Sequence, residues 1–195
     1  MKLIGFFICS CIFFLICCSN QTGVEEDCSE LYEGYQHHIM EARYDSADYY
    51  LTRAFYCDTS NLQYGVELYS LKMQNGRRKE ALNVLRRLQK ISSAVEFSVA
   101  EELLIYEIDG VLDTNALERY LKEYRLRISE GPVSESDVFY FVALSSFLQG
   151  KQQALEQLDN YMHQIDQPTG RLSAIREMIT KRDSIEVAKD AYNVE

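Results

Sequence analysis

The residue types best suited to holding a metal ion occur together at His37, His38 and Glu41. Neighbouring side chains on a helix point about 100° apart, whereas a helical metal-binding pair normally uses positions i and i+4. The two adjacent imidazoles are therefore not expected to share one ion in the usual way. The third histidine, His163, lies far away in the sequence. We accordingly expect no metal site.

Paired carboxylates are a second source of chemistry, because two carboxyl groups in different environments can act as general acid and general base. Glu101 and Glu102 are adjacent, but in an acidic helical chain such a pair is more typical of a solvated face. The sequence has no glycine-rich phosphate loop and no nucleophile elbow, and Gly150-Lys151 lacks the rest of a P-loop. These patterns predict neither an enzyme nor a bound cofactor.

The chain contains six cysteines, of which four lie in or at the end of its apolar N-terminal stretch: Cys9, Cys11, Cys17 and Cys18. The other two, Cys28 and Cys57, open the first predicted helix and close the second. In an antiparallel pair of helices these positions lie at the same end. A disulfide there would stabilise the fold by about 3 kcal/mol. Two free thiols fit the sequence equally well, so both states remain open.

The N-terminal stretch has the layout of a secretion signal. It carries one positive charge, at Lys2, and is almost wholly apolar from Leu3 to Cys18, after which the chain turns polar. The apolar stretch is shorter than the roughly 20 residues that a helix needs to span a bilayer. A permanent membrane span is therefore the weaker of the two interpretations.

The end of this stretch, Leu15-Ile16-Cys17-Cys18, resembles the lipobox of bacterial lipoproteins. The resemblance implies that residues 1–17 are removed and that Cys18 becomes the first mature residue, carrying a diacylglycerol and an amide-linked acyl chain. Such a protein is anchored to the membrane without spanning it. Ser19 implies transport to the outer membrane, and the acidic residues 25–27 resemble a surface-export signal. Periplasmic and surface-exposed locations both remain open.

The composition limits the partners that the folded part can bind. The formal net charge is −10, which argues against nonspecific binding of nucleic acid. The one basic cluster, from Arg77 to Lys90, is expected to form the outer face of a helix. Residues 19–27 are polar and show no apolar periodicity, so we expect residues 18–27 to form a flexible tether between the lipid and the domain.

From residue 28 onward, apolar residues recur at the spacing of amphipathic helices. Eight such stripes follow one another with short connections, and a ninth, longer helix is predicted from Gly170 to Asp190. Helix starts are indicated by Asp113, by Ser134-x-x-Asp137 and by Ser93-x-x-Glu96, which resembles a capping box. The short connections predict antiparallel neighbours and an all-α fold.

Two of the predicted hairpins repeat, with Ala47 and Ala81 at equivalent positions 34 residues apart. This period, the small residue and the apolar residues after it resemble the tetratricopeptide repeat. The resemblance covers residues 28–168 in about four units and implies a right-handed α-solenoid. Residues 169–195 are then expected to form a C-terminal capping helix and tail with a polar outer face.

In tetratricopeptide stacks the first helices of the hairpins line a groove that holds a peptide or a partner helix. The resemblance therefore implies a groove here, and our candidates for exposed groove residues are Tyr32, Gln63 and Tyr64. We expect an interaction scaffold that binds an as yet unidentified envelope protein. The alternative is a cell-surface module that binds a glycan or a small molecule through the tyrosine-rich N-terminal repeats.

Overall fold

The computed structural model describes residues 27–165 and 170–192. The predicted signal (1–17), the predicted lipid-attachment residue Cys18 and the predicted tether up to residue 26 lie outside the described residues, as do residues 166–169 and 193–195. Asp27, the last residue of the predicted tether, is the N-cap of the first described helix instead. None of the helices in the described ranges has the length and apolar character needed to cross a bilayer.

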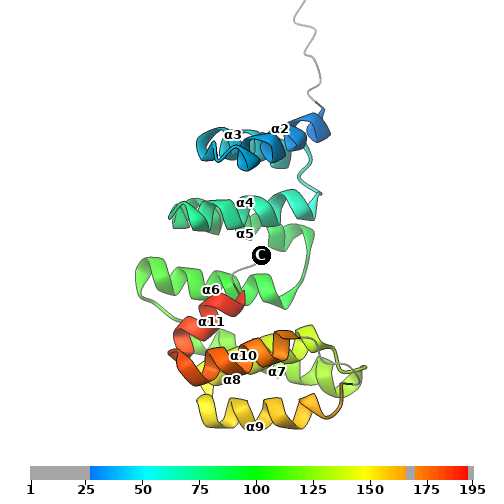
Figure 1. The fold of residues 1–195 in the computed structure, drawn as a ribbon. Helices are drawn as coiled ribbons and strands as arrows, with labels where there is room; N and C mark the ends of the chain where they lie inside the picture. Colours follow the sequence, from blue (N-terminus) through cyan, green and yellow to red (C-terminus); the bar gives the residue numbers. More distant parts are fainter. Residues whose placement is uncertain (1–26, 166–169, 193–195) are drawn as a thin grey trace, which may run out of the picture.

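The described residues form ten helices, stacked in layers along one direction (Figure 1). In chain order these are α2 (Cys28–Met40), α3 (Tyr44–Cys57), α4 (Leu62–Gln74), α5 (Arg78–Ile91), α6 (Val95–Asp109), α7 (Thr114–Glu130), α8 (Glu135–Leu148), α9 (Lys151–Met162), α10 (Gly170–Lys181) and α11 (Ser184–Tyr192). Neighbours in sequence are neighbours in space, and the pairs α2/α3, α4/α5 and α8/α9 pack closely as hairpins. The predicted all-α solenoid is confirmed.

The first two hairpins repeat with a period of 34 residues. Both helices of the second hairpin begin and end 34 positions after those of the first. The N-caps are equivalent as well: Asp27 accepts the backbone N–H of Ser29, and Asn61 accepts that of Gln63. Each cap satisfies a backbone donor that a helix leaves unpaired at its first turn. The same local chemistry therefore builds the same hairpin twice.

The turns inside these two hairpins are also equivalent. Ala42 and Gly76 both adopt the left-handed conformation, with φ of 57° and 70°. In the first turn the backbone N–H of Arg43 donates to the carbonyl of His38 at 2.9 Å, and the second turn repeats this bond 34 residues later at the same distance. Glycine adopts this conformation without the steric cost that a Cβ brings. The first hairpin makes the same turn with an alanine.

The two hairpins approach closely because small residues lie between them. Ala47, Ala54 and Ala81 are fully buried. Gly65 on α4 leaves no room for a side chain, since a Cβ built there would lie 2.8 Å from the ring of Phe55. Close packing of this kind joins both hairpins into one core. Ala47 and Ala81 were predicted from the repeat, whereas the contact at Gly65 was not.

Three predicted helix starts can be compared with the structure. Asp113 caps α7 by accepting the N–H of Ala116, and Ser134 caps α8, so both predictions are confirmed. The capping box at Ser93 is wrong, because the N-cap of α6 is Ala94 and makes no side-chain cap bond. Burial of Val95 and Phe97 in the first turn of α6 accompanies this later start.

The predicted single helix from Gly170 to Asp190 is wrong. The chain leaves the helix after Lys181 and starts a second helix at Ser184. α10 packs against α8 and α9, whereas α11 crosses α6 and α8 (Figure 1). Four residues of α11 are buried, namely Val187, Ala188, Ala191 and Tyr192, whereas Glu186 and Asp190 on its other side are exposed, so α11 has a polar outer face. One straight helix could not bury the apolar residues of both segments on these different surfaces.

Candidate functional site

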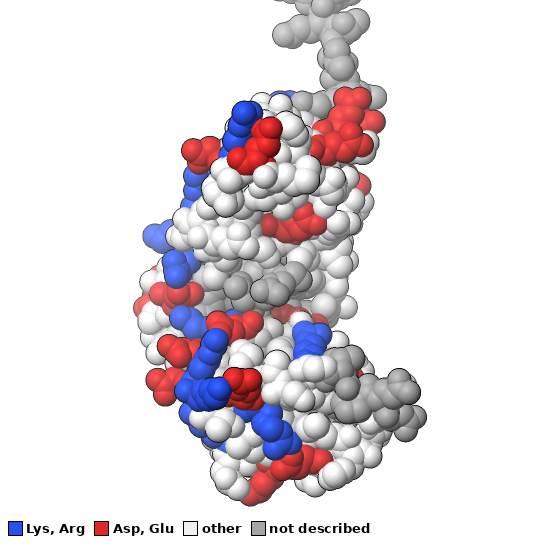
Figure 2. Space-filling view, in the orientation of Figure 1, with Lys and Arg blue, Asp and Glu red and all other residues white. Residues whose placement is uncertain are grey.

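The first helices of the hairpins, α2, α4, α6 and α8, share a surface that we call the first-helix face. Side chains of α2 and α4 interact directly, side chains of α4 and α6 line a common small cavity, and α11 bridges α6 and α8. Figure 2 shows a mostly uncharged area over α4 with an acidic patch in it, further charged groups over the layer of α2 and α3, and mixed basic and acidic groups along one side.

The structure brings the three predicted groove residues together between α2 and α4. The rings of Tyr32 and Tyr64 stack with their centroids 4.6 Å apart. The side-chain amide of Gln63 donates to the hydroxyl oxygen of Tyr32 at 2.8 Å. Gln63 is exposed and Tyr32 is half-buried, as a groove residue can be. Tyr64 is only 9% exposed, so the prediction that it is an open contact residue is wrong. Its ring is used to pack α4 against α2.

Glu67 belongs to this cluster and was missed in the sequence. The hydroxyl of Tyr32 donates to its carboxylate at 2.6 Å, and Gln63 donates to the same oxygen at 3.0 Å. Within the described part of the chain, no Lys or Arg forms an ion pair with Glu67. Burial, and then the nearby Glu67 carboxylate, raise the pKa of Tyr32 to about 12. The same two causes raise the pKa of Tyr35 to about 12.

In the sequence, the only signal for Glu67 as a site residue is its position on the predicted helix. It follows Gln63 by four residues, which places both on one side of α4. The sequence does not show that Tyr32, 35 residues earlier, points at the same carboxylate. We call Tyr32, Tyr35, Gln63 and Glu67 the α2–α4 patch.

The other part of the first-helix face, over α6 and α8, is covered by α11. The hydroxyl of the buried Tyr192 donates to the backbone carbonyl of Tyr140 at 2.8 Å. Its ring lies 5.0 Å from the ring of Tyr140, and burial raises the pKa of Tyr192 well above its usual value. Lys189 forms an ion pair with Glu107 of α6 at 3.5 Å. A groove running the whole length of the solenoid, which the repeat implies, is therefore filled at this end by the chain itself.

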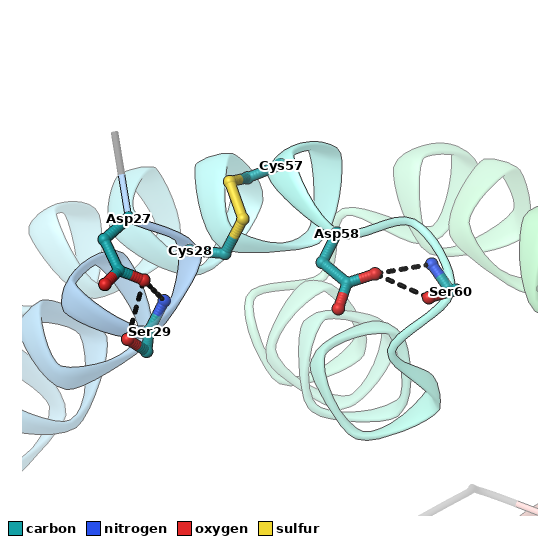
Figure 3. The surroundings of a disulfide bond; sticks show 6 residues. All are labelled: Asp27, Cys28, Ser29, Cys57, Asp58 and Ser60. Carbon is teal, nitrogen blue, oxygen red and sulfur yellow. Dashed lines mark hydrogen bonds between the residues drawn. A yellow bond between two sulfur atoms is a disulfide. The ribbon is translucent and has the colours of Figure 1, made fainter. Parts of the chain in front are cut away.

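Cys28 and Cys57 form a disulfide at the open end of the first hairpin (Figure 3). Their Cα atoms are 5.5 Å apart, within the usual range for a bridge. Each cysteine is next to an aspartate that accepts hydrogen bonds from a serine two residues further on, namely Asp27 with Ser29 and Asp58 with Ser60. Of the two states compatible with the sequence, the structure has the bridge.

The histidine segment lies at the C-terminal end of α2. Nε2 of His37 is 3.4 Å from a carboxylate oxygen of Glu41, and one ligand atom each from His37, His38 and Glu41 lies within 4.8 Å of the others. The side chains thus diverge less than expected. His37 and Glu41 are exposed, and exposed groups of this kind are common without a bound ion. Glu41 also pairs with Arg43 at 3.2 Å, and we propose no metal here.

The basic cluster connects hairpins. Arg77 binds Asp48 at 2.7 Å, Arg78 binds Glu107 at 2.7 Å, and Arg86 binds Glu101 at 2.7 Å. Glu101 is therefore engaged in an ion pair with α5. Burial, and then the neighbouring Asp113 and Glu101 carboxylates, raise the pKa of Glu102. Three arginines of the cluster are thus held by carboxylates of adjacent layers.

The chain matches no protein-family profile, and no curated protein is similar to it in sequence.

Proposed function

We propose that this protein is an interaction scaffold of the bacterial envelope that binds a protein partner through the α2–α4 patch. The observation that carries the proposal is the unequal covering of the first-helix face. α11 packs across α6 and α8, and none of the described helices packs in this way across α2 and α4. The patch combines tyrosines with exposed hydrogen-bonding groups, a composition typical of protein interfaces.

The hairpins are proposed to be tetratricopeptide-like units. The 34-residue period of α2 to α5, with equivalent caps and turns, supports this name for the first two hairpins. The later helices depart from it, since α6 spans 15 residues and α7 spans 17.

The N-terminal signal and Cys18 are proposed to anchor the scaffold to the outer membrane through lipid, with the folded domain in the periplasm or at the surface. The Cys28–Cys57 disulfide supports an oxidising location, because structural disulfides persist outside the cytosol. Replacing Cys18 with Ser should release the protein from washed membranes. A matched Cys17→Ser variant should stay bound. A Cys18→Ser protein that still sediments with membranes would refute lipid attachment at Cys18.

Partner binding is tested with a photo-reactive residue placed at Gln63 in cells that produce the protein. We expect a discrete cross-linked protein, at a ratio near one partner per chain. The control is the same residue at Asn83, which is exposed on α5 and should give no such product. Equal labelling at both positions, or none at Gln63, would contradict a partner at the patch.

The alternative is that the tyrosine-rich N-terminal hairpins bind a glycan. Tyr44, Tyr49 and Tyr56 on α3 are each 53% exposed, which favours keeping this candidate. A glycan-binding module should recover no stoichiometric protein in the cross-linking experiment. It should also lose binding to a glycan array when Tyr49 and Tyr56 are replaced with Ala.

A further inference from the structure

α11 shows how the first-helix face holds a helix. This segment of nine residues buries Val187, Ala188, Ala191 and Tyr192 against α6 and α8. Small side chains at two of these positions allow close approach, and the tyrosine inserts among Tyr124 and Tyr140. A short helix gains little stability by itself, so contact with the face is what keeps α11 folded. The first-helix face is therefore a surface that binds helices.

An ion pair between a lysine of α11 and a carboxylate of α6 also contributes to this contact. Lys189 of α11 lies 3.5 Å from Glu107 of α6, and Glu107 is held in place by Arg78 at 2.7 Å. The carboxylate is half-buried, with 22% of its side chain exposed. An ion pair that is partly removed from water is stronger than one on an open surface. The face thus pairs an acidic group with a lysine of the helix that lies on it.

Glu67 lies on α4, the first helix that precedes α6. Within the described residues, its carboxylate has no lysine or arginine partner. It is half-buried and accepts hydrogen bonds from Tyr32 and Gln63, but no cation pairs with it within the described residues. Hydrogen bonds from neutral groups hold the carboxylate in one position without neutralising its charge. The tyrosine rings beside it also attract cations through their faces. A lysine or arginine placed over Tyr32 and Tyr35 would satisfy both features.

The α2–α4 patch is next to the interface that α11 already forms. Tyr69 and Met73 of α4 line a small cavity together with Leu103 of α6 and with Lys189 and Tyr192 of α11. The last described turn of α11 therefore borders on α4. A helix lying over α2 and α4 would continue the surface that α11 occupies.

We infer that the α2–α4 patch binds an amphipathic, basic helix of a partner protein, with one Lys or Arg against Glu67 and the rings of Tyr32 and Tyr35, and with apolar residues on the rest of its contact face. This inference rests on the proposed function and specifies its partner. Charge complementarity at Glu67 and continuity with the α11 interface select this occupant over a glycan or an acidic segment.

The test uses the full chain in detergent and a displayed library of 18-residue helical peptides, in which surface positions vary among Lys, Glu, Leu, Tyr and Ala. Peptides selected on the wild-type protein should be rich in Lys. Their Kd should rise at least tenfold on a Glu67→Gln variant and stay within twofold on Glu33→Gln, an exposed acid of α2. Glu67→Asp keeps the charge and should retain the preference for Lys. Thermal unfolding of each variant confirms that the fold is intact.

Several outcomes would overturn the inference: no enriched peptide, enrichment of Glu-rich peptides, or equal Kd on wild type and Glu67→Gln. A peptide that enters by displacing α11 belongs to the last case, because its affinity would not depend on Glu67. The proposed function is judged separately by the cross-link at Gln63. If that cross-link persists while the peptides ignore Glu67, the scaffold stands and the basic helix does not.

Discussion

At the scale of single residues, the two equivalent turns show how one backbone conformation is made with different side chains. Ala42 has φ of 57° and Gly76 has φ of 70°. A left-handed conformation costs an L-residue with a Cβ about 1–2 kcal/mol, and glycine avoids this cost. Gly76 has no near neighbour that a Cβ would strike, so conformation alone decides the effect of a substitution there.

Replacing Ala42 with Gly should stabilise the protein by about 0.5–1 kcal/mol, because relief of the left-handed strain exceeds the extra entropy of the unfolded chain. Gly76→Ala should destabilise it by a similar amount. Urea unfolding of both variants measures the difference. The double variant should return close to the wild-type midpoint, since the two turns belong to different hairpins and their effects should add. A destabilised Ala42→Gly would contradict the equivalence of the turns.

A buried ion network joins the first two hairpins. Lys72, which is 5% exposed, lies 2.7 Å from Asp48 and 2.8 Å from Glu80, and Arg77 also binds Asp48. Removing one partner of a buried pair leaves a charge without compensation, and Asp48→Ala should cost about 3–5 kcal/mol. Chemical denaturation measures this loss.

The matched control for Asp48 is Asp45, one turn earlier, whose carboxylate is fully exposed and 3.8 Å from Arg77. Asp45→Ala should change the free energy of unfolding by less than about 1 kcal/mol. A double variant, Asp48→Leu with Lys72→Met, should recover part of the loss by removing both buried charges. Equal effects of Asp45→Ala and Asp48→Ala would show that burial of the network contributes nothing.

At the scale of elements, the disulfide closes the first hairpin of the solenoid, which the described residues otherwise hold only against the second hairpin. The bridged residues are 29 apart in sequence, and a loop of this size gives about 3–4 kcal/mol in the chain-entropy description. Reduction should lower the free energy of unfolding by that amount. Cys57→Ser should be equally destabilised and insensitive to reductant. Two free thiols at these positions in unreduced protein would show that the bridge does not form.

The C-terminal helix is the second element whose contribution can be measured. Tyr192 is 1% exposed and fills the space between α6 and α8, so Tyr192→Ala should cost about 3–5 kcal/mol. Tyr192→Phe keeps the ring and loses only the hydrogen bond to the carbonyl of Tyr140, which should cost about 1 kcal/mol. Thermal unfolding of the two variants compares them. Little loss with Tyr192→Ala would mean that α11 detaches easily from the first-helix face.

Helix periodicity and the 34-residue spacing were enough to predict the first eight helices and the solenoid. They fail where the outcome depends on contacts between distant segments. The break before Ser184 places α11 on α6 and α8, and no local signal states which surface a C-terminal segment will cover. Among the site residues, Tyr32 and Gln63 were predicted from their positions in the repeat. Glu67 was not, because its role comes from a tyrosine on another helix.

At the scale of the whole molecule, tyrosines that are neutral in the folded state connect stability to pH. Burial raises the pKa of Tyr69 to about 12 and that of Tyr124 further still. With Tyr32 and Tyr35 these residues span α2, α4 and α7. A phenol in an unfolded chain has a pKa of about 10. The folded protein therefore holds these protons more tightly than the unfolded chain does.

Stability from these phenols is fully present below pH of about 10, where both states are protonated. As the pH rises from about 10 toward 12, the unfolded chain loses these protons first, so the free energy of unfolding falls. Urea midpoints measured at intervals from about pH 8 to 11.5 should show a plateau and then a decline. The rising negative charge of this acidic chain adds to the decline at the same pH.

Tyr124→Phe separates the two causes, because it removes one buried phenol and leaves the other charges in place. Its midpoint should fall less steeply than that of the wild type above about pH 10, and parallel curves would assign the decline to net charge alone.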